Sequence, residues 1–173
     1  TGGAGCGKTT LLSALLGAAP RHERIITIED VAELRLNHPH HISLEARQAN
    51  REGAGAISLA RLVRESLRMR PDRIVVGECR GEEIRDLLTA LNTGHDGGAG
   101  TLHANGLADV PARLEALGAL AGWDDHAVAR QAASAFDVVL HLARDAAGDR
   151  RLVAVGEFRQ EGGRLEIEQV QPW

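Results

Sequence analysis

The sequence predicts an α/β fold, in which a mainly parallel sheet flanked by helices is closed by a C-terminal antiparallel meander. A glycine-rich turn opens the chain and runs directly into an apolar helical pattern. Two β-branched runs, 24–28 and 73–76, each lead into acidic residues, as buried strands of a parallel sheet often do. Three strand-like runs near the end are separated by short turns, which indicates hairpins.

The opening turn fits G-x-x-x-x-G-K-[ST], the pattern of a phosphate-binding loop. Its small residues let backbone N–H groups point inward, and the helix that follows presents its N-terminus to phosphates. The alternative, a glycine-rich turn that ends in Lys-Thr by chance, is disfavoured by that helix. Lys8 is the only lysine of the chain, although Lys and Arg together number 20. We expect nucleotide contacts from Gly2, Gly3, Ala4, Gly5, Cys6, Gly7, Lys8, Thr9 and Thr10.

Length and composition suit one globular domain of 173 residues with 43% hydrophobic residues. A phosphate loop normally follows a buried strand, so we expect that strand and a further domain upstream of Thr1. A net charge of −4, no tyrosine, two Phe and two Trp argue against nucleic acid as the main partner. Cys6 and Cys79 show no C-x-x-C spacing, which fits a reducing cytosol.

The first strand-like run, 24–28, delivers a group of acids at its carboxyl end. Glu29 and Asp30 follow the run directly, and Glu33 comes close behind. Ligands of open parallel sheets bind outside the carboxyl ends of the strands, so these acids lie where a magnesium nucleotide would be. The alternative is a solvated acidic turn.

The next stretch carries His38, His40 and His41 around Pro39 and continues into a short strand, 41–47. Three histidines could bind a metal, but the proline and the lack of a partnered acid or cysteine cluster favour a turn. After a loop over 48–56, Ser58 caps a helix whose apolar residues recur at helical spacing to 67. Pro71 ends it.

The polar face of that helix carries four arginines: Arg61, Arg64, Arg68 and Arg70. They are either a solvated surface or residues directed at phosphates of this or a neighbouring subunit. Arg47 and Arg80 are further candidates for the second role.

The run 73–78 predicts a second buried strand that ends on a carboxylate, Glu78. Gly77 stands where the magnesium-binding Asp of a Walker B motif is usual. Glu78 could align and deprotonate an attacking water, or hold magnesium through water. The alternative is a surface glutamate. A helix over 82–92 follows and stops near Gly94.

A glycine-rich loop with a short strand spans 93–105 and carries His95 and His103. Histidines can donate to phosphate oxygens, so the loop could sense the γ-phosphate. The alternative is a mobile loop with two surface histidines. Helices are expected over 112–121 and 125–135, and the closing meander over 137–142, 152–158 and 165–170.

Four ordered blocks give the chain a resemblance to a known family. Residues 2–9 resemble its Walker A motif, 27–34 its Asp box, 67–81 its atypical Walker B motif, and 92–97 with 101–105 its His box. The chain resembles the C-terminal ATPase domain of type II/type IV secretion and pilus-assembly ATPases, most closely the tight-adherence (Flp) type called CpaF or TadA. Gly77 is normal for that family. Cys6 and Cys79 depart from commoner residues.

The resemblance implies a RecA-like P-loop NTPase core over 1–173. It implies a homohexamer in the cytoplasm, peripheral at the inner membrane face, that hydrolyses ATP. The hexamer would act on a membrane platform protein to move a pilus or secrete a substrate, with no nucleic acid expected. Magnesium would be held by Thr9, Glu29, Asp30 and Glu33.

The hypothesis for the chemistry is in-line attack of water on the γ-phosphate held by Lys8. Glu78 and Glu33 are the two candidates for orienting the water. His103, with His95 as a second candidate, would report loss of the γ-phosphate, and an arginine among Arg47, Arg68 and Arg80 would act across the subunit contact. The rivals are a scaffold that binds ATP without useful hydrolysis and a RecA-like nucleic-acid motor. No lid segment for a nucleotide kinase is visible.

Overall fold

The computed structural model describes residues 1–95 and 97–170, which form two compact units. The core unit comprises residues 9–101, and the meander unit comprises residues 1–8 and the chain from 102 onward. Each unit has its own sheet and its own helices.

The sheet of the core unit has four parallel strands in the order β2-β1-β3-β4. These strands are β1 (Ile25–Glu29), β2 (His41–Glu45), β3 (Arg73–Val76) and β4 (Ala99–Gly100). β1 is buried over its whole length, as expected for a β-branched run with neighbours on both sides. Ile25 is in register with both His41 and Arg73, so the amino ends of three strands share one edge of the sheet. The opposite edge collects their carboxyl ends.

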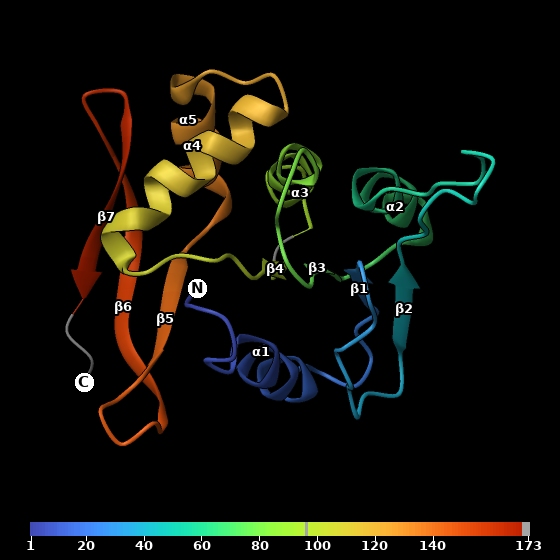
Figure 1. Ribbon diagram of the computed structural model, residues 1–173, viewed down its shortest axis with the longest axis horizontal. Helices are drawn as coiled ribbons and strands as arrows, with labels where there is room; N and C mark the ends of the chain where they lie inside the picture. Colours follow the sequence, from blue (N-terminus) through green and yellow to red (C-terminus); the bar gives the residue numbers. More distant parts are fainter. Residues whose placement is uncertain (96, 171–173) are drawn as a thin grey trace. The chain divides into compact units, whose positions relative to one another are not determined.

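Helices cover both faces of this sheet. α1 (Lys8–Gly17) lies on one face, and α2 (Leu59–Ser66) with α3 (Glu83–Leu91) lies on the other (Figure 1). The apolar residues of α1 pack into a core cluster formed by Leu12, Leu16, Ile25, Leu34 and Val75. The predicted α/β arrangement is therefore confirmed.

α2 begins where the sequence predicts and ends earlier. The Ser58 side chain accepts the Arg61 amide at 3.3 Å, as an N-cap does. After Ser66 the chain tightens into a 3₁₀ turn, η1 (Leu67–Met69), and Arg70 takes a left-handed φ of 51°. A residue that precedes a proline avoids the α-helical region, so Pro71 keeps Arg70 out of a helical conformation.

The meander unit has the antiparallel order β5-β6-β7, as expected. Its elements are η2 (Leu107–Asp109), α4 (Val110–Leu120), α5 (Asp125–Ala135), β5 (Val138–Arg144), β6 (Arg150–Glu161) and β7 (Arg164–Val170). A Cβ at Gly118 would lie 2.2 Å from Val128 Cγ2, so α4 and α5 approach closely because position 118 has no side chain. Phe136 and Phe158 pack with ring centroids 5.4 Å apart.

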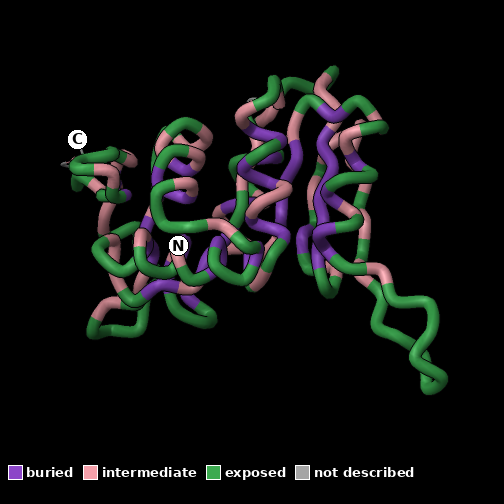
Figure 2. Tube along the Cα trace, turned by 90° about the horizontal axis from the view of Figure 1, so that it is seen from above, coloured by how far each residue is buried: buried purple, intermediate pink, exposed green. Residues whose placement is uncertain are grey.

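The loop 48–56 of the core unit is exposed throughout and projects as the long green segment at the right of Figure 2. It closes by backbone pairing of Arg47 with Ile57 and by turns around Asn50. Among the helices of the described residues, none is long and apolar enough to cross a bilayer.

Candidate functional site

The phosphate-loop candidate belongs to the meander unit and begins beside β5. The Leu142 amide donates to Thr1 O at 3.0 Å, and Gly2 forms a parallel bridge with Leu142. A Cβ at Gly2 would lie 2.3 Å from the Leu142 carbonyl oxygen, so no other residue fits there. Gly5 and Gly7 have φ of 66° and 100°, in the region that favours glycine. The glycines of the motif therefore meet requirements of the backbone.

Lys8, the first residue of α1, folds back onto the loop that it follows. Its Nζ donates to Gly2 O and Gly3 O at 2.9 Å each. Carbonyl oxygens that turn toward the ammonium leave the opposing N–H groups of the same peptides directed away from it. The loop thus combines a positive charge with the start of a helix, two features that attract phosphate. Thr9 and Thr10 occupy the first turn of α1.

Glu29, at the carboxyl end of β1, is buried, with 4% of its surface exposed. Its Oε1 accepts the amides of Glu33 at 3.2 Å and Leu34 at 3.1 Å. Burial raises the pKa of this carboxyl, although the two amide hydrogen bonds act in the opposite direction. Glu29 therefore anchors the loop 30–34, while Asp30 and Glu33 remain on its exposed surface.

The space above Gly77 is taken by Glu29. A Cβ at Gly77 would lie 2.6 Å from Glu29 Cγ, closer than real side chains approach. The glycine that replaces the usual Walker B aspartate is thus explained by packing: the neighbouring strand supplies a carboxylate in the place where an aspartate would begin.

Glu78 follows Gly77 and is held by Arg80. Arg80 Nε donates to Glu78 Oε2 at 2.7 Å, and a second guanidinium nitrogen pairs with the same oxygen. The pKa of Arg80 is raised first by this hydrogen bond, then by the charges of Glu78, Asp30 and Glu33. Arg80 in the loop after β3 thus lies within the electrostatic influence of carboxylates from both loops, and the magnesium and water roles of these acids stay predictions.

Glu83 anchors the loop after β3 and was not singled out by the sequence. It is buried, and its Oε1 accepts the amides of Arg80 at 2.5 Å and Gly81 at 2.8 Å. A carboxylate in the first turn that reaches back to preceding amides resembles half of a capping box, which is a recognisable sequence signal. Thr101, also buried, donates its hydroxyl to Gly77 O at 2.6 Å. Burial raises the pKa of the Cys79 thiol in the same loop.

The arginines and histidines proposed for phosphate contacts have local partners. Arg47 Nε donates to Gly55 O at 2.6 Å, and Arg68 pairs with Glu65 at 3.3 Å on its own segment. His95 Nδ1 lies 3.2 Å from Ala90 O. His103 lies in the meander unit and is half-buried. Their phosphate roles stay predictions, and Asp96 of the His box lies outside the described residues.

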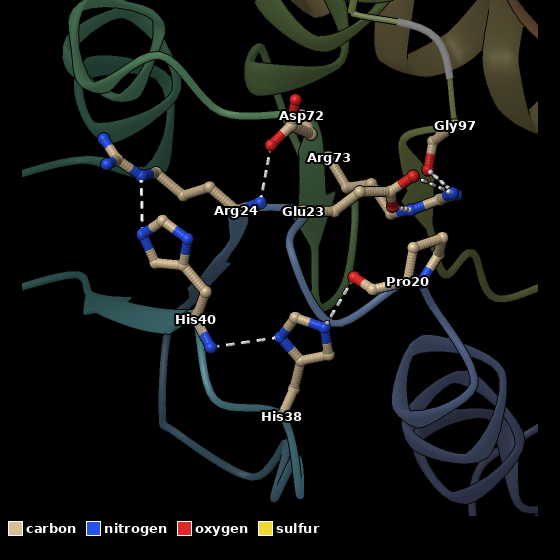
Figure 3. A network of polar contacts seen from close by, with 8 residues as sticks. All are labelled: Pro20, Glu23, Arg24, His38, His40, Asp72, Arg73 and Gly97. Carbon is tan, nitrogen blue, oxygen red and sulfur yellow. Dashed lines mark hydrogen bonds and ion pairs between the residues drawn. The ribbon is translucent and has the colours of Figure 1, made fainter.

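The histidines at 38–41 turn to separate partners in the core unit. His38 Nε2 lies 3.1 Å from Pro20 O, and His40 Nε2 accepts Arg24 Nε at 2.9 Å (Figure 3). His41 Nε2 lies 2.9 Å from the Thr27 hydroxyl, and burial lowers its pKa. The preferred interpretation of these residues as a turn agrees with this arrangement.

Magnesium fits the donors at the carboxyl edge. Among the described residues, no three His, Cys, Asp or Glu side chains are grouped to hold a metal by themselves. Magnesium usually takes one or two carboxylates and completes its shell with water and substrate phosphates. The exposed side chains of Asp30 and Glu33 suit that chemistry, and the Thr9 hydroxyl stays a predicted donor.

Two arginines of the β5–β6 hairpin lie against the phosphate loop and were missed by sequence reasoning. Arg144 donates to Gly5 O at 2.9 Å, and a Cβ at Gly7 would lie 3.1 Å from Arg150 Cδ. No local pattern links positions so far apart in the chain.

The chain is similar to known proteins in sequence and in structure. A family model described as "Type II/IV secretion system protein" matches residues 1–168. A Mycobacterium tuberculosis (strain H37Rv) protein named "Putative conjugal transfer protein Rv3659c" is 59% identical over 165 residues, which cover 95% of this chain and 47% of that protein.

The fold of this chain is also similar to solved structures of a secretion ATPase and of a pilus motor. The crystal structure of the VirB11 ATPase from the Brucella suis type IV secretion system, in complex with sulphate, has a TM-score of 0.79 and 32% identity, covering 90% of this chain and 46% of that one. The pilus retraction motor PilT with bound ADP has a TM-score of 0.63 and 27% identity, covering 96% and 46%. The chain thus spans about half the length of these relatives.

Proposed function

The chain belongs to the type II/IV secretion system protein family, and on that premise we propose that it is the ATP-hydrolysing part of a secretion or pilus-assembly motor. The main support for this proposal is the geometry of the phosphate loop. Its glycines adopt backbone angles that favour glycine, its single lysine is held at its own carbonyls, and a helix begins at that lysine. Among similar structures, one is named an ATPase and another a retraction motor with bound ADP.

In the proposed reaction, water attacks the γ-phosphate of ATP in line with the departing ADP. Lys8 and the loop amides bind the phosphates. Thr9, with Asp30, Glu33 and Glu29 as the acidic candidates, would hold Mg²⁺, which neutralises phosphate charge when bound.

The attacking water would be oriented by Glu78 or Glu33. Arg80 supports Glu78 in this role, because its guanidinium holds one carboxylate oxygen of Glu78 in a fixed direction. His103, with His95 as a second candidate, would report loss of the γ-phosphate. Arg47, Arg68 and Arg80 are the candidates for action across a subunit contact.

For the assembly, we propose a homohexamer of the tight-adherence pilus type. Residues 1–173 would be the RecA-like ATPase domain of a longer protein. It would act in the cytoplasm at the inner membrane face on a platform protein. The family match and the partial coverage of the relatives support this proposal.

The test measures MgATP binding and steady-state phosphate release by the full-length protein and by Lys8→Ala. We expect the variant to lose at least about 100-fold in turnover, because the charge on the transferred phosphoryl group is no longer neutralised. The exposed Arg113 on α4 supplies the control, Arg113→Ala, which should behave as the wild type.

Other outcomes select the alternatives. Tight ATP binding with negligible turnover in the assembled oligomer would identify a scaffold. Strong stimulation by single- or double-stranded nucleic acid would identify a nucleic-acid motor. Equal turnover by wild type and Lys8→Ala would overturn the assignment of the phosphate loop.

A further inference from the structure

Arg144, the last residue of β5, bridges two carbonyl groups that are remote in sequence. One guanidinium nitrogen donates to Gly148 O at 2.7 Å, within the β5–β6 turn. The other donates to Gly5 O at 2.9 Å, in the phosphate loop. A planar guanidinium can serve two acceptors in fixed directions, which a lysine ammonium on a flexible stem cannot do equally well. The phosphate loop is therefore tied to the turn.

The β5–β6 turn is itself held in one shape. Asp145 Oδ1 accepts the amides of Ala147 and Asp149 at 3.0 Å each, and Arg151 Nε donates to the other carboxylate oxygen. Backbone bonds close the turn, with Asp145 N donating to Asp149 O and Gly148 N to Asp145 O, both at 2.9 Å. Arg144 thus fastens the loop to an internally cross-linked hairpin.

Fixing the carbonyl of Gly5 also fixes the amide of Cys6. The two groups belong to one planar trans peptide, in which C=O and N–H point in opposite directions. With the oxygen held toward Arg144, the Cys6 N–H is turned away from the arginine. Outward carbonyls with inward amides are the arrangement that a phosphate-cradling loop needs.

Arg150 makes a second contact between hairpin and loop. A Cβ at Gly7 would lie 3.1 Å from Arg150 Cδ, so the aliphatic stem of Arg150 packs where position 7 has no side chain. Cys6, between the two contacted glycines, is only 3% exposed. The hairpin therefore supports the loop on both sides of Cys6.

We infer that Arg144 is a positioning residue of the phosphate loop, acting on bound phosphates through the Gly5–Cys6 peptide. The inference rests on the proposed function for its ligand, a nucleoside triphosphate. Arg144 should act on binding, because its hydrogen bonds go to the phosphate loop and to the β5–β6 turn. Its loss should weaken MgATP affinity and leave turnover at saturating ATP within about twofold.

The nucleotide-independent test is the alkylation rate of Cys6 by iodoacetamide, followed by peptide mass spectrometry on the full-length protein. In Arg144→Ala we expect Cys6 to react several-fold faster than in the wild type, since the loop opens more often. Cys79, buried in the core unit, should keep its wild-type rate and reports any general unfolding.

The ligand-dependent test is the dissociation constant of MgATP. Arg144→Ala should raise this constant about tenfold, as expected for loss of a hydrogen bond to a charged donor. Arg144→Lys keeps the charge but not the bridge, and should resemble Arg144→Ala. Arg159, an exposed arginine on β6 that pairs with Glu157 and Glu168, supplies the control Arg159→Ala, which should match the wild type in both assays.

The two assays separate the possible failures. An unchanged Cys6 rate and an unchanged affinity in Arg144→Ala would overturn the inference, as would wild-type behaviour of Arg144→Lys. If Cys79 also reacts faster in Arg144→Ala, that variant is partly unfolded, and Arg144→Lys then provides the test. A wild-type protein that fails to bind MgATP overturns the proposed function, while the Cys6 rates still test the tie between hairpin and loop.

Discussion

The two edges of the parallel sheet in the core unit are both rich in charged side chains, yet they use them differently. At the amino edge, charges of opposite sign pair with one another. Arg73 forms a two-pronged contact with Glu23, at 2.5 and 3.2 Å, and reaches Gly97 O (Figure 3). Asp72 accepts the amide of Arg24 at 2.6 Å. These contacts link the amino ends of the strands to neighbouring segments.

At the carboxyl edge, beside the Glu78–Arg80 ion pair, two buried carboxylates bind backbone amides. Glu29 and Glu83 each accept two amides from the loop beside them. The loops so anchored carry further acids, Asp30 and Glu33, on their exposed sides. The comparison teaches that density of charge does not mark a site. An edge that fixes its loops through amides, and keeps other acids accessible to solvent, is equipped for a cation and a phosphate.

The largest expected effect separates the two edges by activity. Glu78→Gln should lower the turnover of the full-length protein by at least about 100-fold, as for loss of a general base, and leave the melting temperature nearly unchanged. Arg73→Ala at the other edge should lower the melting temperature and leave the turnover nearly unchanged. Steady-state phosphate release and thermal melting measure both. Unchanged turnover in Glu78→Gln would transfer the role to Glu33.

The packing of Glu29 over Gly77 provides the next test. Gly77→Ala should destabilise the fold by about 1–3 kcal/mol, because its Cβ would meet Glu29 Cγ. In a Glu29→Ala background the same change should cost little, which chemical denaturation can measure as a coupling energy. Additive effects of the two substitutions would contradict the steric account of Gly77.

The Arg73–Glu23 pair should contribute a smaller amount. Both side chains are mostly buried, with 28% and 19% of their surfaces exposed, and the contact is two-pronged. A double-mutant cycle with Arg73→Ala and Glu23→Ala should give a coupling of about 1 kcal/mol and no change in ATP turnover. A loss of turnover would show that the two edges are not separate in function.

The smallest expected effect is a pH dependence at the amino edge. The pKa of His41 is lowered by burial first and by the charge of His38 second. The unfolded chain therefore takes up the proton more readily, so stability is full above the ordinary histidine pKa, about 6.5, and is lost as pH falls through it. His41→Gln should reduce this slope in denaturation curves recorded between pH 8 and pH 5.5.

A residual slope is expected in that variant. Burial also lowers the pKa of His141 in the meander unit, so its titration acts in the same direction. A slope identical to that of the wild type would show that His41 does not titrate on unfolding.

The order and type of the elements could be predicted from local patterns. The β-branched run before Glu29 forms the fully buried β1, and Ser58 caps α2 where the spacing of its apolar residues begins. The meander follows from short turns between strand-like runs. The end of α2 could not be predicted to the residue, because after Ser66 the chain tightens into the 3₁₀ turn η1 before it reaches Arg70 and Pro71.

The candidate site was only partly predictable. The sequence motifs locate Lys8, Glu29 and Glu78, because each of these residues lies at the end of a predicted strand or at the start of a predicted helix. They do not distinguish Glu29, which is buried on amides, from Asp30, which is exposed one residue later. Burial depends on what packs above the strand end, and that is a property of neighbouring strands.

By itself, the sequence determined the phosphate loop, the parallel core, the closing meander and the family. These depend on residue spacing along one segment, where backbone geometry follows from nearby side chains. Only the tertiary structure decided that Glu29 fills the space above Gly77, that Glu83 anchors the turn of Arg80, and that Arg144 holds Gly5. Such contacts join residues on different strands and turns, so they depend on distances that no local pattern encodes.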